Sequence, residues 1–406
     1  MAGRMASLFG IRRDALKPFG TVWLSHLLVE VFLLMHPALV PIFREEFGLS
    51  ILQAGLLISI PSICRLIIVI PTGILADRYG SLRFVVLSLL LGGLSALVLS
   101  QTASVFFLIF SITLITISVT LYHPPGMSVV SALFPNQSER SRAMGWHSAS
   151  GCIGQAVGTI SLGLLLAQYG WRFSYLLFSF PVLFWGLALA KIGIPHSSEG
   201  NKSLNAAGPI ATETAKATQN GSVKKRGFLI FLSAMGLNAL ANGGIMAFMT
   251  TYLTSAQNLS LEVASVIFGF GPIIGIFGSV AAGYVSAKFG DKNSLALIFL
   301  GQFIFLLGLI AIPFLALAMF SYLMYQLFNH AVWTPSTSMV VSLMGETGGG
   351  TAYSLFYFSN DLLGSASPLL AAVLIENLGF GLIAPFVLAL GLLIVCALMV
   401  RFIKPE

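Results

Sequence analysis

The sequence predicts an all-α membrane protein with twelve transmembrane helices, arranged as two pseudo-symmetric six-helix bundles. The first observation is composition: of 406 residues, 57% are hydrophobic and 9% are charged, whereas a soluble domain carries about 25% charged residues. The second is a series of twelve apolar stretches, most of them near the ~20 residues that a membrane-spanning helix needs. The third is an internal repeat. Together they exclude a soluble multidomain protein and a disordered chain.

Charged and turn-forming residues separate the apolar stretches from one another. The predicted spans are 19–43, 51–76, 83–100, 104–133, 143–168, 172–194, 228–255, 261–288, 294–312, 315–343, 350–376 and 382–403. The runs are continuous rather than alternating, which disfavours lipid-facing strands. The longest spans must be tilted, kinked or partly outside the hydrocarbon.

The distribution of basic residues predicts the orientation. Of the 21 Lys and Arg, all except Arg44, Arg65 and Arg172 fall on the side that holds both termini. Basic residues collect in cytoplasmic loops, so we expect a multi-pass protein of the plasma membrane with both termini in the cytoplasm. The net charge of +7 follows from this bias and does not indicate a nucleic-acid partner. The three cysteines lack metal-ligand spacing, and we expect free thiols.

One long hydrophilic stretch, 195–227, lies between the sixth and seventh spans. Its Ser, Thr, Asn, Gly and Ala residues are typical of a flexible linker. The predicted domains are therefore an N-terminal bundle at 1–194, a cytoplasmic linker at 195–227 and a C-terminal bundle at 228–406.

The two bundles share sequence features about 210 residues apart. The matching pairs lie at equivalent helix ends or within equivalent helices: Gly73 and Gly283, Gly80 and Gly290, Pro124 and Pro335, Gly154 and Gly364. Parallel repeats of this kind enclose a central site at their interface.

The residues after the second span carry a family resemblance. Gly73-x-Leu75-x-Asp77-Arg78-x-Gly80-x-x-Arg83 resembles the signature between helices 2 and 3 of the major facilitator superfamily, and Gly283…Lys288-x-Gly290-x-Lys292 resembles its degenerate second copy. The resemblance covers essentially the whole chain and implies the major facilitator fold. It also implies that Gly73, Asp77, Arg78, Gly80, Arg83 and Lys288 are gating residues. A basic loop that only sets topology explains Arg78 and Arg83, but not Asp77 or the glycine spacing.

Two shorter motifs narrow the resemblance. Glu45-Glu46-Phe47-Gly48-Leu49-Ser50 and Tyr122-His123-Pro124 resemble the fosmidomycin-resistance branch of drug exporters, which implies export of a small amphiphilic or anionic compound. The fourth span departs from many proton-coupled members, because Ile112 stands where they carry an Arg. This leaves uptake of a small organic anion, bound by Arg65, as the alternative. A non-transporting membrane sensor or scaffold is the alternative from another class.

Polar and ionisable residues at membrane depth are costly and are candidates for function. Nine converge near one depth and are predicted to bind substrate or protons: His26, Glu30, Arg65, Gln155, Asn238, Asn242, His330, Asn360 and Asp361. Glu30 and Asp361 are the predicted proton carriers, because burial favours the neutral form of a carboxyl group. The structural alternative is a fixed ion pair between Glu30 and Arg65.

Two histidines of the N-terminal bundle receive structural interpretations. His123 and Pro124 mark a helix kink, where side chains satisfy freed carbonyls, and Pro335 marks the equivalent kink. His147, near the start of its span, is interpreted as interfacial.

The chain carries no phosphate-binding loop and no nucleophile elbow. We therefore expect no enzyme, no cofactor and no metal. The expected function is secondary active transport by alternating access, proton-coupled and directed to export. The expected partners are a small-molecule substrate, protons and the lipid bilayer, with the chain acting as a monomer.

Overall fold

The computed structural model describes residues 12, 14–192, 225–312, 314–344 and 350–403. In these ranges the chain is helical and forms no strand. The helices of the N-terminal half are α2 (Leu16–Glu30), α3 (Met35–Ala38), α4 (Val40–Phe47), α5 (Ile51–Tyr79), α6 (Ser81–Leu99), α7 (Val105–Leu133) and α8 (Gln137–Ile192). Those of the C-terminal half are α11 (Lys225–Ser255), α12 (Leu261–Phe289), α13 (Asp291–Ala311), α14 (Leu315–Ala331), α15 (Trp333–Met344), α16 (Gly350–Gly364), α17 (Ser367–Ala372), the π-helical η1 (Val373–Asn377) and α18 (Ala384–Arg401).

These helices make up the twelve predicted spans. Ten helical segments of the described chain are long and apolar enough to cross a membrane. One of them contains two spans, because α8 is interrupted at Gly170, whose φ of 71° is non-helical. The tenth span is divided between α14 and α15, each too short to cross alone. Residues 195–224 of the predicted linker lie outside the described residues.

Local sequence sets several helix ends. Ser50 and Gln53 form a reciprocal capping box at the start of α5. Gly80 and Gly290, with φ of 95° and 84°, end α5 and α12 at equivalent places in the repeat. A positive φ is costly for residues with a Cβ, so glycine is required at both turns.

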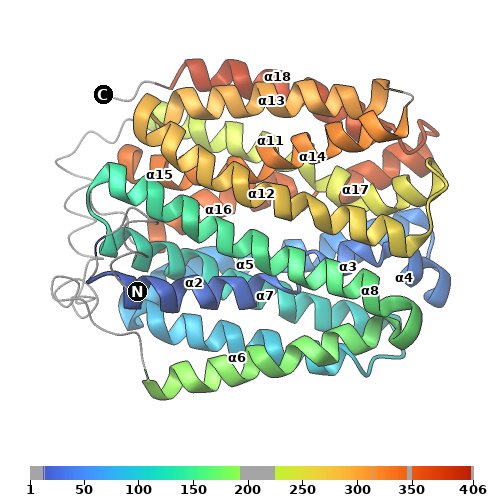
Figure 1. The fold of residues 1–406 in the computed structure, drawn as a ribbon, viewed down its shortest axis with the longest axis horizontal. Helices are drawn as coiled ribbons and strands as arrows, with labels where there is room; N and C mark the ends of the chain where they lie inside the picture. The colour runs from blue at the N-terminus through green and yellow to red at the C-terminus, as the bar shows by residue number, and fades with distance from the viewer. Residues whose placement is uncertain (1–11, 13, 193–224, 313, 345–349, 404–406) are drawn as a thin grey trace.

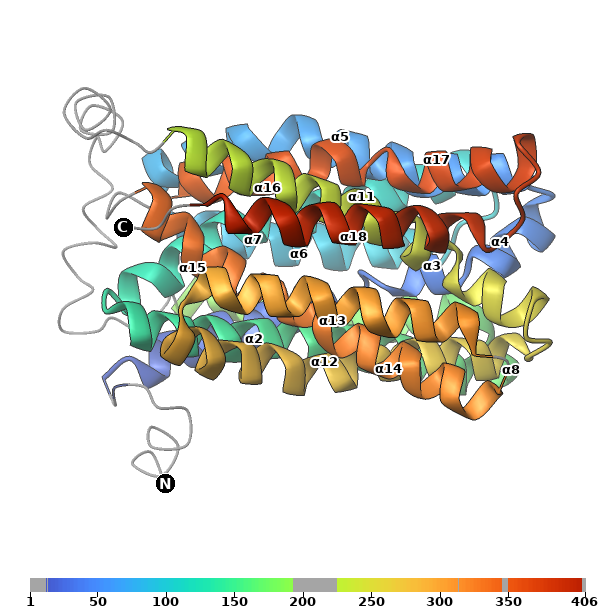
Figure 2. The same cartoon turned by 90° about the horizontal axis from the view of Figure 1, so that it is seen from above.

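The two halves lie side by side along their length. Figure 1 shows the N-terminal half, blue to green, below the C-terminal half, yellow to red, with their helices running roughly parallel. The halves meet where α8 packs against α12 and where α5 packs against α16 and α17. Figure 2 shows α5 beside α16 and α17 from a second direction.

Contacts between the halves occur at both ends of the bundle. At one end, the Ser141 hydroxyl of α8 lies 3.0 Å from that of Ser338 on α15. At the other end, the Leu52 backbone N–H donates to Glu376 Oε2 over 2.6 Å. The two halves therefore touch at both ends of the bundle.

Three spans are broken next to predicted site residues. α2 ends at Glu30 and α16 ends three residues after Asp361, while α14 ends one residue after His330. Pro335 and Pro368 each stand four residues beyond the end of α14 and α16. A proline removes the hydrogen bond to the carbonyl four residues earlier, which explains why these helices stop there. α7, in contrast, continues as one helix through Pro124 and Pro125.

Candidate functional site

A central cavity of about 300 Å³ lies between the two halves. Each of the nine residues predicted to bind substrate or protons lines it: His26, Glu30, Arg65, Gln155, Asn238, Asn242, His330, Asn360 and Asp361. The N-terminal half supplies four of these side chains, and the C-terminal half supplies the other five. The structure thus brings both sets together at the interface of the repeats.

Arg65 and Asp361 form an ion pair across the cavity. The Arg65 guanidinium, on α5, donates to Asp361 Oδ1 on α16. The side chains are 20% and 4% exposed, so the aspartate is the more deeply buried partner. The structural alternative, a fixed ion pair of Glu30 with Arg65, is not found, because helix α16 of the other half brings Asp361 to the arginine instead.

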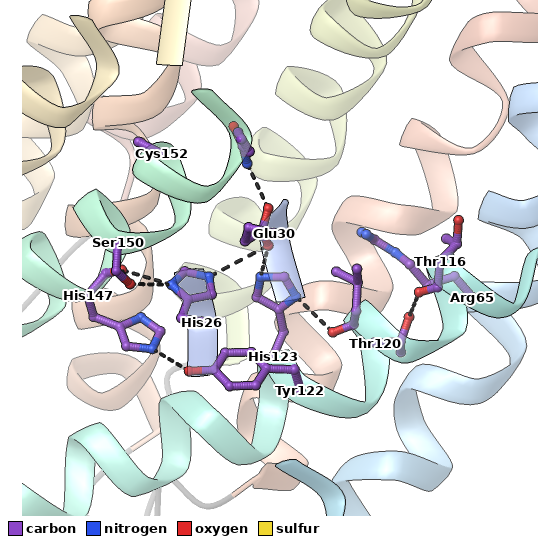
Figure 3. A network of polar contacts seen from close by, with 12 residues as sticks. His26, Glu30, Arg65, Thr116, Thr120, Tyr122, His123, His147, Ser150 and Cys152 are labelled. Carbon is purple, nitrogen blue, oxygen red and sulfur yellow. Dashed lines mark hydrogen bonds and ion pairs between the residues drawn. The ribbon is translucent and has the colours of Figure 1, made fainter. Parts of the chain in front are cut away.

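Glu30 is surrounded by three side chains of its own half. Its Oε1 lies 3.0 Å from His123 Nε2 and 3.6 Å from His26 Nε2. Its Oε2 accepts a hydrogen bond of 2.7 Å from Gln155 Nε2. Figure 3 shows the two imidazoles directed at the Glu30 carboxylate. The predicted kink residue His123 therefore also belongs to the cavity.

The His26 ring is stacked against neighbouring aromatic rings of its own half. The His26 ring lies 4.1 Å from that of His147 and 5.2 Å from that of Tyr122, with interplanar angles of 8° and 5°. The Tyr122 hydroxyl donates to Val22 O over 2.8 Å and lies 3.0 Å from His147 Nε2. The prediction that His147 is interfacial is wrong: its exposed fraction is 0%, because α2 and α7 cover this part of α8.

Close helix packing holds this network in place. A Cβ added at Gly151 would stand 2.7 Å from His26 Cε1 and 3.3 Å from Glu30 Cγ. A Cβ at Gly154 would stand 2.1 Å from Leu27 O. Glycine at these positions therefore lets α8 approach α2 closely enough for Gln155 to reach Glu30.

The C-terminal half presents amides and a histidine to the cavity. Asn242 Nδ2 donates to Asn238 O over 2.7 Å and to Asn238 Oδ1 over 2.9 Å, and the Tyr325 hydroxyl donates to Asn242 Oδ1. His330 Nδ1 lies 3.3 Å from the Cys152 thiol of the opposite half. These contacts fix the orientations of the Asn242 and His330 side chains.

Several buried polar atoms around the cavity have no hydrogen-bond partner within the described chain: Gln155 Oε1, His330 Nε2, Asn360 Oδ1 and Asp361 Oδ2. Buried polar groups are nearly always hydrogen-bonded. Four unpartnered groups around one cavity are typical of a place that receives a polar ligand.

Sequence reasoning missed further residues that line the cavity. They include Ser62, Met127, Cys152, Met246, Trp333 and Tyr357. Most of them stand three or four positions from a predicted residue on the same helix, as Ser62 does from Arg65 and Tyr357 from Asp361. Helical spacing from the predicted polar residues was the signal that could have found them.

The predicted gating residues divide into two groups. Asp77 accepts hydrogen bonds from the Gly350 N–H over 2.7 Å and from the N–H and hydroxyl of Thr351 over 2.9 and 2.7 Å, at the start of α16. Gly73 permits the contact, since a Cβ there would stand 2.0 Å from Ser354 Oγ.

The basic members of the predicted gating group are exposed: Arg78, Arg83 and Lys288. Gly80 forms the turn between α5 and α6.

Comparison with known proteins agrees with this architecture. The family model described as Major Facilitator Superfamily matches residues 22–368. The chain is 21% identical over 383 residues to the hexuronate transporter of Bacillus subtilis, covering 90% of this chain and 89% of that protein. It is 26% identical over 272 residues to the cis,cis-muconate transport protein of Acinetobacter baylyi, covering 65% of this chain and 64% of that protein.

A more partial similarity links the chain to a resistance protein, and a solved structure shares its fold. The quinolone resistance protein NorB of Staphylococcus aureus is 25% identical over 166 residues, which cover 41% of this chain and 35% of that protein. The crystal structure of a bacterial homologue of the human lysosomal transporter Spinster superposes with a TM-score of 0.68 at 16% identity, covering 96% of this chain and 95% of that one. With a family match over most of its length, this chain belongs to the Major Facilitator Superfamily and is a membrane transporter of small organic solutes, not an enzyme.

Proposed function

We propose that this protein is a secondary active transporter that carries a small organic anion together with a proton by alternating access. The single observation that carries the proposal is the ion pair of Arg65 and Asp361, which joins the two halves in the cavity. Two relatives support the chemical class, since a hexuronate and cis,cis-muconate are both carboxylates.

The ion pair couples the anion to the proton. A substrate carboxylate binds the Arg65 guanidinium, which favours bidentate contacts with carboxylates, and displaces Asp361. An unpaired charge in a buried site costs about 3–5 kcal/mol, so the displaced carboxylate takes up a proton. Anion and proton then occupy the cavity together. Under an inward proton gradient this mechanism drives uptake.

The halves move around this site by breaking the contacts at one end at a time. Asp77 joins α5 to α16 at one end, and Glu376 joins η1 to α5 at the other. We place the Asp77 end in the cytoplasm of the cell, together with both termini, because basic residues concentrate there. In this proposal the chain works as a monomer in the plasma membrane, and Arg78, Arg83 and Lys288 act at the cytoplasmic gate.

Export of an amphiphilic compound is the second candidate function. It is favoured by the apolar part of the cavity wall, which includes Leu33, Leu34, Met127, Met246 and Trp333, and by the similarity to a quinolone resistance protein. In that case a proton enters as the compound leaves, and Asp361 or Glu30 carries it.

Transport in sealed proteoliposomes tests the proposal. With labelled cis,cis-muconate or a hexuronate outside, we expect an acidic exterior to drive accumulation. Arg65→Gln should abolish the flux, whereas Asp361→Asn should leave anion exchange intact and remove the response to the pH gradient. Arg44→Gln, an arginine outside the cavity whose Nε donates to Leu49 O, serves as the matched control.

Three outcomes contradict the proposal. Proton-driven flux that survives in Arg65→Gln would exclude the arginine as the anion site. A pH response retained in both Asp361→Asn and Glu30→Gln would exclude both predicted proton carriers. Proton-driven extrusion of a quinolone, with no flux of either anion, would favour the second candidate function.

A further inference from the structure

Three ligand atoms of the N-terminal half converge at one point of the cavity wall. His26 Nε2, His123 Nε2 and a Glu30 carboxylate oxygen lie within 4.8 Å of one another. The two nitrogens are 3.6 and 3.0 Å from Glu30 Oε1. Neither the ion pair nor the gating contacts uses this cluster.

Hydrogen bonds fix which nitrogen of each ring faces the glutamate. His26 Nδ1 lies 2.8 Å from His147 O, and His123 Nδ1 lies 3.0 Å from Val119 O. A backbone carbonyl can only accept, so each Nδ1 carries the proton and donates it. In the neutral rings both Nε2 atoms therefore present lone pairs toward the carboxylate. Two nitrogen lone pairs and an anionic oxygen directed at one point repel one another unless a cation, either a proton or a metal ion, neutralises them.

The hydrogen bonds that hold these three side chains also match those around the ligands of a metal site. Histidines that bind metals almost always donate the other ring N–H to a carbonyl or carboxylate, and a ligating carboxylate is itself hydrogen-bonded. Gln155 Nε2 supplies the latter contact to Glu30 Oε2 at 2.7 Å. Figure 3 shows the rings of His26 and His123 on neighbouring sides of Glu30.

The spacing also suits a metal ion. Ligands about 2.1 Å from an ion stand about 3.4 Å apart at a tetrahedral angle and about 3.0 Å apart at a right angle. The distances from the two Nε2 atoms to Glu30 Oε1, 3.0 and 3.6 Å, lie close to these values. Two imidazoles and one carboxylate select a divalent transition metal over Mg²⁺ or Ca²⁺, which prefer oxygen ligands.

We propose that His26, His123 and Glu30 form a binding site for a divalent transition-metal ion, such as Zn²⁺ or Co²⁺, whose open coordination positions face the cavity. All three ligands come from α2 and α7 of one half, so the site stays intact when the other half moves. An ion bound there can therefore be carried through the alternating-access cycle. The site requires neither the organic anion nor Asp361.

Cobalt binding to purified protein tests this proposal without any transport assay. The full chain, purified with a histidine-free tag and freed of metal by a chelator, is titrated with Co²⁺ while its visible d–d absorption is recorded. We expect one ion per chain, displaced by Zn²⁺. Glu30→Gln and His123→Gln should each weaken binding by about tenfold or more. His330→Gln, which alters another cavity histidine, should bind Co²⁺ as the native chain does.

A second variant guards against loss of the fold. His123→Cys keeps a metal ligand at the same position, so Co²⁺ should add a thiolate charge-transfer band that the native chain lacks. Thermal unfolding confirms that each variant is folded before titration. Absence of saturable Co²⁺ binding in the native chain would overturn the proposal and leave protons as the cations of this cluster. Binding that persists in Glu30→Gln and His123→Gln, or that His330→Gln abolishes, would place the ion elsewhere.

Discussion

The guanidinium of Arg65 on α5 and the carboxylate of Asp361 on α16 are 296 positions apart in the sequence and form an ion pair in the central cavity. Each residue belongs to a different six-helix half. The pair therefore joins the two halves, and in the proposed function its arginine also binds the anionic substrate. Its two roles can be separated by measuring stability in the absence of substrate.

Removing one partner of the pair should destabilise the protein more than removing both. In Asp361→Asn or Arg65→Gln the remaining charge is left without its partner, and breaking a buried pair costs about 3–5 kcal/mol. Because Arg65 is 20% exposed to the cavity, we expect the lower part of this range. The double variant should recover part of the loss. Thermal unfolding midpoints of the four proteins in detergent form a double-mutant cycle, and additive losses would show that the residues are not coupled.

The carboxylates of Asp77 and Glu376 should hold opposite ends of the bundle closed. Hydrogen bonds to charged groups contribute about 1.5–3 kcal/mol, so Asp77→Asn and Glu376→Gln should each raise the population of a state open at one end by about tenfold. The native Cys152 thiol, which lines the cavity and is 3% exposed, reports on access. We expect a membrane-impermeant maleimide to modify it faster in both variants, from opposite sides of sealed vesicles.

The thiol assay needs a chain with one reactive cysteine and a neutral control. Cys64→Ser and Cys396→Ser remove the other two thiols. Glu45→Gln replaces an exposed carboxylate on α4 and should leave the rate unchanged. Faster labelling from the same side in both variants would contradict the assignment of two separate gates.

Gly158 should tolerate no side chain. A Cβ there would stand 1.9 Å from Val31 O, in the segment that follows the end of α2. Overpacking typically costs about 1–3 kcal/mol, and here the obstacle is backbone, so Gly158→Ala should lower the thermal unfolding midpoint. Gly20→Ala is the matched control, since nothing lies within 4 Å of a Cβ at Gly20. A helical Gly→Ala change in open space is neutral or stabilising. Equal midpoints for the two variants would show that α8 can move away from α2.

The outer pair of Glu46 and Arg172 should give a pH-dependent contribution to stability. Burial opposes ionisation of Glu46, but hydrogen bonds from Arg172 over 2.5 Å and from Trp171 over 2.9 Å outweigh it and hold the pKa of Glu46 below its usual value. The contribution is therefore present above the ordinary carboxyl pKa of about 4.3 and is lost as the pH falls through the lower, folded-state pKa.

Comparison with a variant isolates this contribution. The difference in unfolding midpoint between the native chain and Arg172→Gln should be constant from neutral pH down to about pH 5 and shrink below it. It should also be small, because exposed ion pairs contribute about 0–1 kcal/mol. A difference that grows on acidification would have the wrong sign for this pair.

The fold could be predicted from the sequence because the bilayer imposes it. Within hydrocarbon the backbone must satisfy its own hydrogen bonds, so each long apolar run becomes a helix. The predicted boundaries differ from the observed ones by only a few residues at most ends, as with 51–76 against Ile51–Tyr79 for α5. The exceptions are breaks inside three spans: the tenth after Ala331, the eleventh after Gly364 and the first after Glu30. Pro37 within it was visible in the sequence, but the exact place of the break depends on packing against α8.

The sequence by itself determined the twelve helices, the repeat and which polar residues lie at membrane depth, because burial in lipid is a local property of each segment. Only the tertiary structure decided their partners. It joined Arg65 to Asp361 rather than to Glu30, and it buried His147 among rings from α2 and α7. Depth follows from position along one helix, whereas a partner depends on how two helices, distant in sequence, are rotated against each other. That rotation is set by close contacts between helices, such as those that Gly151 and Gly154 of α8 make with α2. The sequence of one helix does not specify them.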